Sequence, residues 1–357
     1  MNKRAVSVAL VLALAFFAGG LTFAGAANAE IKLSFNNYFP PTHMASKLTA
    51  DFCKEIEKRS KGEVKIQHYP GGQLLKAPKV FDGVVQGIAD MGFSNLAYTR
   101  GRFPEMEICD LPVGMPSGWV STQVVNAFYQ KYRPKEFNQA HMLFFCACGP
   151  NLISTTTKAV RTLADLKGQT LRGTGRIADT VEALGAVSRP IGIGDTYESV
   201  KRNVISGVML PLETMRGFRL GELLKYCTAD WQVGNVYTFY AVMNKKKYDS
   251  LPPKIKKIFD QVSKEWIDKA AWGWNIIDLE GARFFRKKGG KVINLSDAEA
   301  AKWVAAVQPV IAKYTKDMEA KGIKASVIKE RLSFIKDSVR KFTARQKAKN
   351  IQMPTAE

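Results

Sequence analysis

The sequence predicts an α/β protein built from two domains. Three observations support this prediction: strands and helices alternate along the chain, the alternation resumes after a loop-rich middle region, and the chain is too long for one compact core. Helices and strands that alternate at this spacing form βαβ units, which produce mainly parallel sheets. The 357 residues are 46% hydrophobic and 24% charged, which is ordinary for a globular protein.

The N-terminal end has the features of a secretory signal peptide. A basic start leads into an apolar stretch over residues 5–24, and the small-residue sequence Ala-Asn-Ala follows at 27–29. We therefore expect residues 1–29 to be removed, the mature chain to begin at Glu30 and the protein to reside in the periplasm. A retained membrane anchor is the alternative, but glycines weaken the stretch and no stop-transfer sequence follows it.

The segment after residue 30 predicts strand–helix units. Residues 31–35 alternate apolar and polar side chains, which is typical of a strand with one buried face. Gly62 and Gly87 follow two helical segments, and glycine commonly ends a helix. The predicted elements are strands over 31–35, 64–66 and 89–93 and helices over 45–58 and 77–86.

The second half of the chain predicts a second domain and a long connecting helix. The chain crosses between the domains near Gly149 and Tyr237, so we expect hinge strands there. The predicted elements are strands over 170–172 and 236–243 and helices over 177–184, 197–205, 253–287 and 297–321. The expected boundaries are 30–149 plus 238–275 for domain I, 150–237 plus 276–330 for domain II, and 331–357 for a basic C-terminal helical tail.

The formal net charge of +21 indicates an acidic partner. Nucleic acid, an anionic membrane surface and an acidic ligand are the usual candidates, and the export signal argues against nucleic acid. Many of the lysines occupy solvated faces of predicted helices, so much of the charge is expected to be ordinary surface.

The cysteines and histidines give no sign of a metal centre or a catalytic group. The five cysteines include Cys146 and Cys148, whose spacing places both sulfurs on one face of a strand. The three histidines, His43, His68 and His141, show no metal-ligand spacing. We expect buried thiols, no metal, no cofactor and no catalytic residue.

Several short motifs follow one another from about residue 31 to 315. They are Lys61-Gly-Glu-Val64 with Tyr69-Pro-Gly-Gly-Gln-Leu74, Gln86-Gly-Ile-Ala-Asp-Met91, Asp110-Leu-Pro112, Leu163-Ala-Asp-Leu-Lys-Gly168 with Leu171-Arg172, and Leu184-Gly-Ala186 with Tyr197-Glu198. Together they resemble the dicarboxylate-binding (DctP-type) family of solute receptors for tripartite ATP-independent (TRAP) transporters. Their order is far more specific than any one motif.

The resemblance implies a two-lobed receptor of the type II-like periplasmic fold, which closes around a small organic acid and delivers it to TRAP permease subunits. A monomer is expected. In the family, an arginine at the position of Arg172 forms a salt bridge with the ligand carboxylate. A guanidinium suits this role because it stays charged and matches a carboxylate with two parallel hydrogen bonds.

Departures from the family pattern suggest a less polar ligand. Ser206 replaces an acidic residue, Leu210 stands where an asparagine often contacts the ligand, and Asn151 lies where many members offer a second arginine. Trp231, Tyr237 and Phe239 are candidates for an apolar pocket wall, although aromatic residues near strands are often core residues. The complete set of expected ligand-binding residues is His43, Asn95, Asn151, Arg172, Gly175, Tyr197, Leu210, Glu213, Trp231 and Tyr237.

Two enzyme classes and one structural role compete with parts of this interpretation. Gly173-Thr-Gly175 precedes a helix, with Asp195 twenty residues beyond, so it also satisfies a loose dinucleotide-binding pattern. A secreted hydrolase is the second alternative, but no histidine lies in a nucleophile motif. His43 has a structural alternative as well, because its ring could stabilise a turn instead of contacting the ligand.

Overall fold

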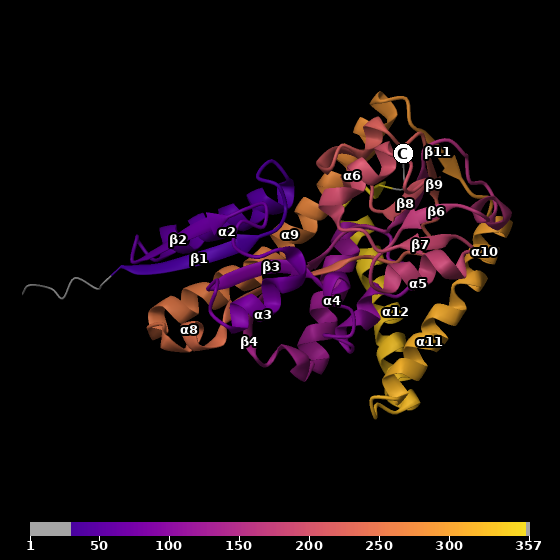
Figure 1. Ribbon diagram of the computed structural model, residues 1–357. Helices are drawn as coiled ribbons and strands as arrows, with labels where there is room; N and C mark the ends of the chain where they lie inside the picture. Colours follow the sequence, from indigo (N-terminus) through magenta and orange to yellow (C-terminus); the bar gives the residue numbers. More distant parts are fainter. Residues whose placement is uncertain (1–29, 355–357) are drawn as a thin grey trace, which may run out of the picture.

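A computed structural model describes residues 30–354 as two lobes, each built around one β-sheet (Figure 1). The predicted signal peptide at 1–29 lies outside the described residues. The α/β class and the two-lobed architecture are confirmed, while the precise domain boundaries stay a prediction. No helix within the described range is long and apolar enough to span a membrane.

The first lobe contains a five-stranded sheet. Its strand order is β2 (Val64–Tyr69), β1 (Ile31–Asn37), β3 (Met91–Asn95), β10 (Thr238–Asn244) and β4 (Ala140–Ala147). Strand β1 runs parallel to β2 and β3, whereas β10 is antiparallel to both of its neighbours. The helices packed on this sheet are α2 (Met44–Arg59), α3 (Val80–Val85), α4 (Gly118–Tyr132) and α8 (Lys245–Ser250).

The second lobe contains a six-stranded sheet. Its strand order is β11 (Lys291–Asn294), β9 (Tyr226–Ala229), β5 (Leu152–Thr155), β8 (Gly207–Leu210), β6 (Thr170–Arg172) and β7 (Val187–Arg189). Strand β5 is antiparallel to β8 and β9, and the other pairs are parallel. The helices of this region are α5 (Arg176–Ala183), α6 (Ile193–Lys201) and α7 (Glu213–Gly217).

The two antiparallel strands have a common origin. Strands β5 and β10 each follow a segment that crosses between the lobes, so they enter their sheets without a preceding βα connection. The crossing segments lie side by side: Cys148 N donates to Tyr237 O at 3.3 Å, and Asn151 N donates to Asn235 O at 2.9 Å. The chain therefore crosses at both predicted hinge positions.

Helix α9 (Pro253–Lys287) is the third connection between the lobes (Figure 1). Its buried residues include Ile255, Phe259, Val262 and Trp266, at the spacing of one apolar helix face. The helix packs against α2, α4 and β4 in the first lobe and against α7 and β11 in the second. Both lobes are thus built against one rigid element.

Some predicted elements differ from those in the structure. The helix expected over 197–205 is α6, which ends at Lys201 because Asn203 adopts a left-handed conformation with φ 56°. The helix expected over 297–321 is divided into α10 (Asp297–Ala306) and α11 (Gln308–Glu319), with Pro309 in the first turn of α11. Short 3₁₀ helices cover Ala77–Lys79, Leu96–Thr99, Met106–Asp110, Lys135–Phe137, Leu163–Leu166 and Leu220–Glu222.

The C-terminal helix α12 (Ala325–Ala348) folds back onto the first lobe. It packs against α4 and α11, and Ser117 Oγ donates to Gln346 Oε1 at 2.6 Å. The buried face of α12 includes Ile328, Ile335 and Phe342. Its basic residues therefore belong to a packed helix that also has an apolar face.

Candidate functional site

A narrow cavity lies between the two lobes, and we call it the interlobe cavity. Its volume is about 20 Å³, which is the room that one water molecule needs. Its walls come from the segments after β1, β3 and β8 and from the ends of β6 and β10. The lining residues are Tyr38, Phe39, Asn95, Tyr98, Arg172, Ile193, Leu210, Pro211, Glu213, Thr214, Phe218, Tyr237 and Phe239.

Arg172 is a buried cation in this cavity with neutral hydrogen-bond partners. Arg172 is the last residue of strand β6, and its exposed fraction is 2%. Its Cζ atom lies over the Tyr237 ring, 5.5 Å from the ring centroid. Nε donates to Ile191 O at 2.9 Å and Nη1 donates to the Tyr237 hydroxyl at 2.8 Å. Within residues 30–354 no carboxylate oxygen lies within 4.0 Å of this guanidinium, and Nη2 makes no hydrogen bond. A charge buried in this way is costly unless an anion joins it.

The opposite walls of the cavity are aromatic. The Tyr38 ring stacks on Phe39 with centroids 4.3 Å apart, and Phe239 stacks on the buried Trp274 at 4.5 Å. Phe218 lies 6.0 Å from Phe39 on the second-lobe side. An aromatic lining of this kind favours an apolar ligand body over a hydrated one.

Asn95 and Tyr38 add a neutral polar group to this wall. Asn95 Nδ2 donates to the Tyr38 hydroxyl at 3.1 Å, while Asn95 Oδ1 is buried and has no hydrogen-bond partner among the described residues. Burial raises the pKa of Tyr38 well above its usual value, so the phenol stays protonated. The Asn95 amide and the Tyr38 hydroxyl can therefore form hydrogen bonds with a ligand without adding a charge to the cavity.

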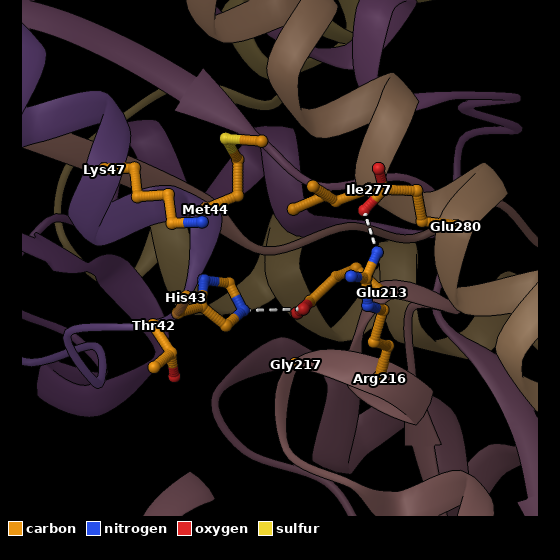
Figure 2. A pocket seen from close by; sticks show the side chains of 9 residues that line it. All are labelled: Thr42, His43, Met44, Lys47, Glu213, Arg216, Gly217, Ile277 and Glu280. Atoms are coloured by element: carbon orange, nitrogen blue, oxygen red, sulfur yellow. Dashed lines mark hydrogen bonds and ion pairs between the residues drawn. The ribbon is translucent and has the colours of Figure 1, made fainter.

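Among the residues that the structure describes, Glu213 is the one acidic residue that lines the interlobe cavity. It begins α7, and its Oε2 lies 2.8 Å from Nε2 of His43, which comes from the loop before α2 (Figure 2). The two side chains thus meet across the lobes, and both are buried. Glu213 also lines a second, larger cavity of about 350 Å³ together with Lys47, Arg216 and Glu280; we call it the outer cavity (Figure 2).

The structure brings together five of the ten predicted ligand-binding residues and places His43 directly behind them. Asn95, Arg172, Leu210, Glu213 and Tyr237 line the interlobe cavity. The His43 ring contacts Glu213 and the aromatic wall from outside it.

The other four predicted residues lie elsewhere. Trp231 lines a separate cavity with Leu152 and Cys227 in the second lobe and does not line the interlobe cavity. The Tyr197 hydroxyl donates to Glu222 at 3.2 Å, away from the cavity. Asn151 Nδ2 donates to Asn235 O at 3.1 Å, in the crossing segments.

Gly175 packs closely against Ala97 of the first lobe. A Cβ atom at Gly175 would lie 2.8 Å from Ala97 Cα, and the Gly175 carbonyl accepts a hydrogen bond from Arg100 at 3.3 Å. The glycine turn before α5 is therefore filled by protein, which leaves no room for the pyrophosphate that the dinucleotide interpretation requires. No group of His, Cys, Asp or Glu within 30–354 could hold a metal ion.

The sequence did not indicate most of the aromatic wall. Tyr38 and Phe39 directly precede the Pro-Pro break after β1, and that break was a usable signal for a loop at the carboxyl end of a strand. Phe218 follows the short helix α7, and Tyr98 lies in a 3₁₀ turn; neither position has a local sequence signal.

All five cysteines are buried and unpaired by disulfides, in agreement with the prediction of buried thiols. Trp274 Nε1 lies 3.1 Å from the sulfur of Cys146, and Tyr237 N lies 3.2 Å from the sulfur of Cys148. Burial raises the pKa of both thiols, so neither is a reactive thiolate.

Comparisons with known proteins identify the family of this chain. The sequence profile of the bacterial extracellular solute-binding proteins, family 7, matches residues 35–317. A solute-binding protein of Albidiferax ferrireducens is 27% identical over 269 residues, which cover 72% of this chain and 77% of that protein.

Solved structures give the same relationship. A TRAP periplasmic solute-binding protein from Desulfovibrio salexigens superposes with a TM-score of 0.78 at 30% identity, covering 88% of this chain and 97% of the other. A marine metagenome TRAP protein specific for aromatic acid ligands, in complex with metahydroxyphenylacetate, superposes with a TM-score of 0.82 at 26% identity, covering 87% and 99%. This chain therefore belongs to family 7 of the bacterial extracellular solute-binding proteins, the solute receptors of TRAP transporters.

Proposed function

We propose that this protein is a periplasmic receptor for an aromatic monocarboxylate, which Arg172 anchors in the interlobe cavity and which the protein hands unchanged to TRAP permease subunits. The buried Arg172 guanidinium, with neutral partners and no carboxylate within 4.0 Å among the described residues, carries this proposal. A ligand carboxylate would supply the missing countercharge and occupy the free Nη2.

The aromatic character of the ligand follows from the remaining walls. Phe39, Phe218 and Phe239 line the cavity, and Leu210 contributes an aliphatic side chain. Burying a benzene ring there stabilises the complex through removal of apolar area from water. The solved relative that is specific for aromatic acid ligands supports the same ligand class.

Isothermal titration with benzoate tests the anchor. Arg172→Ala should weaken binding by a hundredfold or more, on the order of 3–5 kcal/mol, since it leaves the bound carboxylate without a partner. Arg172→Lys should recover only part of this loss because an ammonium cannot form the paired hydrogen bonds of a guanidinium. If Arg172→Ala binds benzoate within a few-fold of the wild type, the anchor is wrong. Benzoate recovered chemically intact after prolonged incubation checks that the protein is a receptor without turnover.

Ligand entry requires the lobes to separate. A volume of about 20 Å³ neither admits nor holds a benzoate, so we expect the lobes to be further apart in the bound form and further still in an open form, through rotation about the crossing segments near Gly149 and Tyr237. Small-angle X-ray scattering should show a smaller radius of gyration when benzoate saturates the protein. An unchanged radius at saturation would contradict closure.

A further inference from the structure

We infer that Glu213 reads a hydrogen-bond donor on the ligand, so that the preferred ligand is an aromatic monocarboxylate with a hydroxyl group on its ring and a second carboxylate is rejected. The inference rests on the proposed function, because it assumes that the first carboxylate lies at Arg172. It assigns a second ligand contact to a residue that the family motifs do not mark.

The hydrogen bonds of His43 determine which group donates to which. His43 Nδ1 accepts the backbone N–H of Ala45 at 3.1 Å, as the N-cap of α2. Because Nδ1 uses its lone pair in this bond, the proton of the neutral ring is on Nε2. Nε2–H therefore donates to Glu213 Oε2 at 2.8 Å, and Glu213 acts as an acceptor.

The surroundings of His43 hold this arrangement in place. The ring lies 4.5 Å from Phe39 and 5.1 Å from Phe218, measured between centroids. A Cβ atom at Gly217 would lie 2.6 Å from His43 Nε2 and 2.8 Å from Glu213 Oε2, so only glycine at this position leaves room for the pair. Figure 2 shows the imidazole and the carboxylate facing each other above Gly217.

Glu213 keeps one oxygen available. Within residues 30–354 His43 is the one basic side chain within 4.0 Å of this carboxylate, and Oε1 makes no hydrogen bond. Arg172 lines the same cavity but is not paired with Glu213. The same cavity is thus lined by a guanidinium without a carboxylate partner and by a carboxylate with one oxygen unbonded among the described residues.

Arg172 and Glu213 together discriminate between ligands by the charges that the ligands carry. A hydroxyl group can donate to Glu213 Oε1 while the ligand carboxylate binds Arg172. A second carboxylate would place two negative charges together at a buried position, where the low effective dielectric makes repulsion strong. The marine metagenome relative, solved with metahydroxyphenylacetate and with 3-hydroxybenzoate, shows that ligands of this shape occur among related receptors.

Substitution of Glu213 by glutamine gives a specific test. In Glu213→Gln the His43 Nε2–H still needs an acceptor and holds the side-chain carbonyl, so the amide NH₂ faces the cavity and replaces an acceptor with a donor. Calorimetric titrations with benzoate, 3-hydroxybenzoate and benzene-1,3-dicarboxylate measure the consequence. The matched control is Glu280→Gln, which removes a carboxylate from the outer cavity, where Glu280 pairs with Arg216 at 2.6 Å.

The wild type and Glu280→Gln should bind 3-hydroxybenzoate roughly tenfold or more tightly than benzoate, as expected for a hydrogen bond to a charged group. Glu213→Gln should lose this preference, and its affinity for the dicarboxylate relative to benzoate should be roughly tenfold higher than in the wild type. Thermal unfolding checks that the variants fold.

Two outcomes have different meanings. Benzoate binding that depends on Arg172, combined with a hydroxyl preference that is missing in the wild type or persists in Glu213→Gln, overturns this inference and leaves the proposed function standing. Benzoate binding that is indifferent to Arg172 overturns the proposed function, and the role of Glu213 falls with it.

Discussion

Two buried arginines, four positions apart, have opposite electrostatic surroundings. Arg176, in the first turn of α5, is 4% exposed and pairs with Glu107 at 2.9 Å and with Asp317 at 2.8 Å. Arg172, at the end of β6, is 2% exposed and bonds to a backbone carbonyl and a phenol. A buried arginine whose charge is already neutralised by the protein holds elements together, whereas one with neutral partners is suited to receive an anion.

The partners of Arg176 explain its structural character. Glu107 lies in the segment between β3 and α4, and Asp317 lies in α11, so the guanidinium joins three regions that are distant in the sequence. Its Nη1 also lies 3.6 Å from Asp179 in α5 itself. No ligand is needed to satisfy this charge.

The largest expected effect is on folding stability and separates the two arginines. Arg176→Met should lower the free energy of unfolding by about 3–5 kcal/mol because it leaves Glu107 buried without a cation. Arg172→Met should leave the ligand-free protein as stable as the wild type or slightly more so, since it removes a buried charge that has no counterion. Urea denaturation without ligand measures both values, and equal losses in the two variants would refute the distinction.

Asp230 is a buried acidic residue, and it provides a comparison with the buried arginines. Asp230 is 1% exposed, its Oδ1 accepts from Ile153 N at 3.4 Å, and its Oδ2 has no hydrogen-bond partner among the described residues. Burial raises the pKa of Asp230 to about 7. The folded state therefore holds a proton that the unfolded state releases near pH 4, and this contribution to stability is lost as the pH rises through 7.

Asp230→Asn should remove that pH dependence. The amide keeps an oxygen for Ile153 N and presents a neutral group at the other position. Relative to the wild type, the variant should gain about 2–4 kcal/mol of unfolding free energy between pH 4 and pH 8. Urea unfolding of both proteins at several pH values isolates this residue from other titrating groups, and parallel curves for the two proteins would contradict the prediction.

Local sequence signals predicted the elements well where one segment determines the outcome. Helix α9 matches the predicted 253–287 because its apolar periodicity is long and a proline begins it. The signals failed where distant segments decide. The antiparallel direction of β5 and β10 depends on the path of the crossing segments. The early end of α6 has a local cause instead, because the left-handed Asn203 lies two residues beyond it.

The site shows the same division. Motif context identified Arg172, which the structure places as a buried cation in the interlobe cavity, but an aromatic residue near a strand carries no information about which face it occupies. Trp231 consequently lies in another cavity, and Phe218 was missed. The counterions that distinguish Arg176 from Arg172 come from positions 69 and 141 residues away, beyond the reach of spacing rules.

The smallest expected effect sharpens the contrast through the tyrosine beside each arginine. The Arg172 guanidinium carbon lies 5.5 Å from the centroid of Tyr237, and that of Arg176 lies 5.0 Å from the centroid of Tyr314. The Tyr237 oxygen accepts from Arg172 Nη1 at 2.8 Å and so orients the fork, whereas the Tyr314 hydroxyl donates to Pro104 O at 3.0 Å.

Tyr237→Phe should therefore reduce benzoate affinity several-fold, equivalent to about 0.5–1.5 kcal/mol, because the guanidinium keeps its position but loses the bond that orients Nη1. Tyr314→Phe should leave benzoate affinity unchanged and lower the free energy of unfolding by about 1 kcal/mol through loss of one hydrogen bond. Calorimetry measures the benzoate affinity of both variants, and urea denaturation measures their free energies of unfolding. If Tyr314→Phe weakens ligand binding as much as Tyr237→Phe does, the two arginines act as one coupled unit, and the assignment of one to structure and the other to the ligand is wrong.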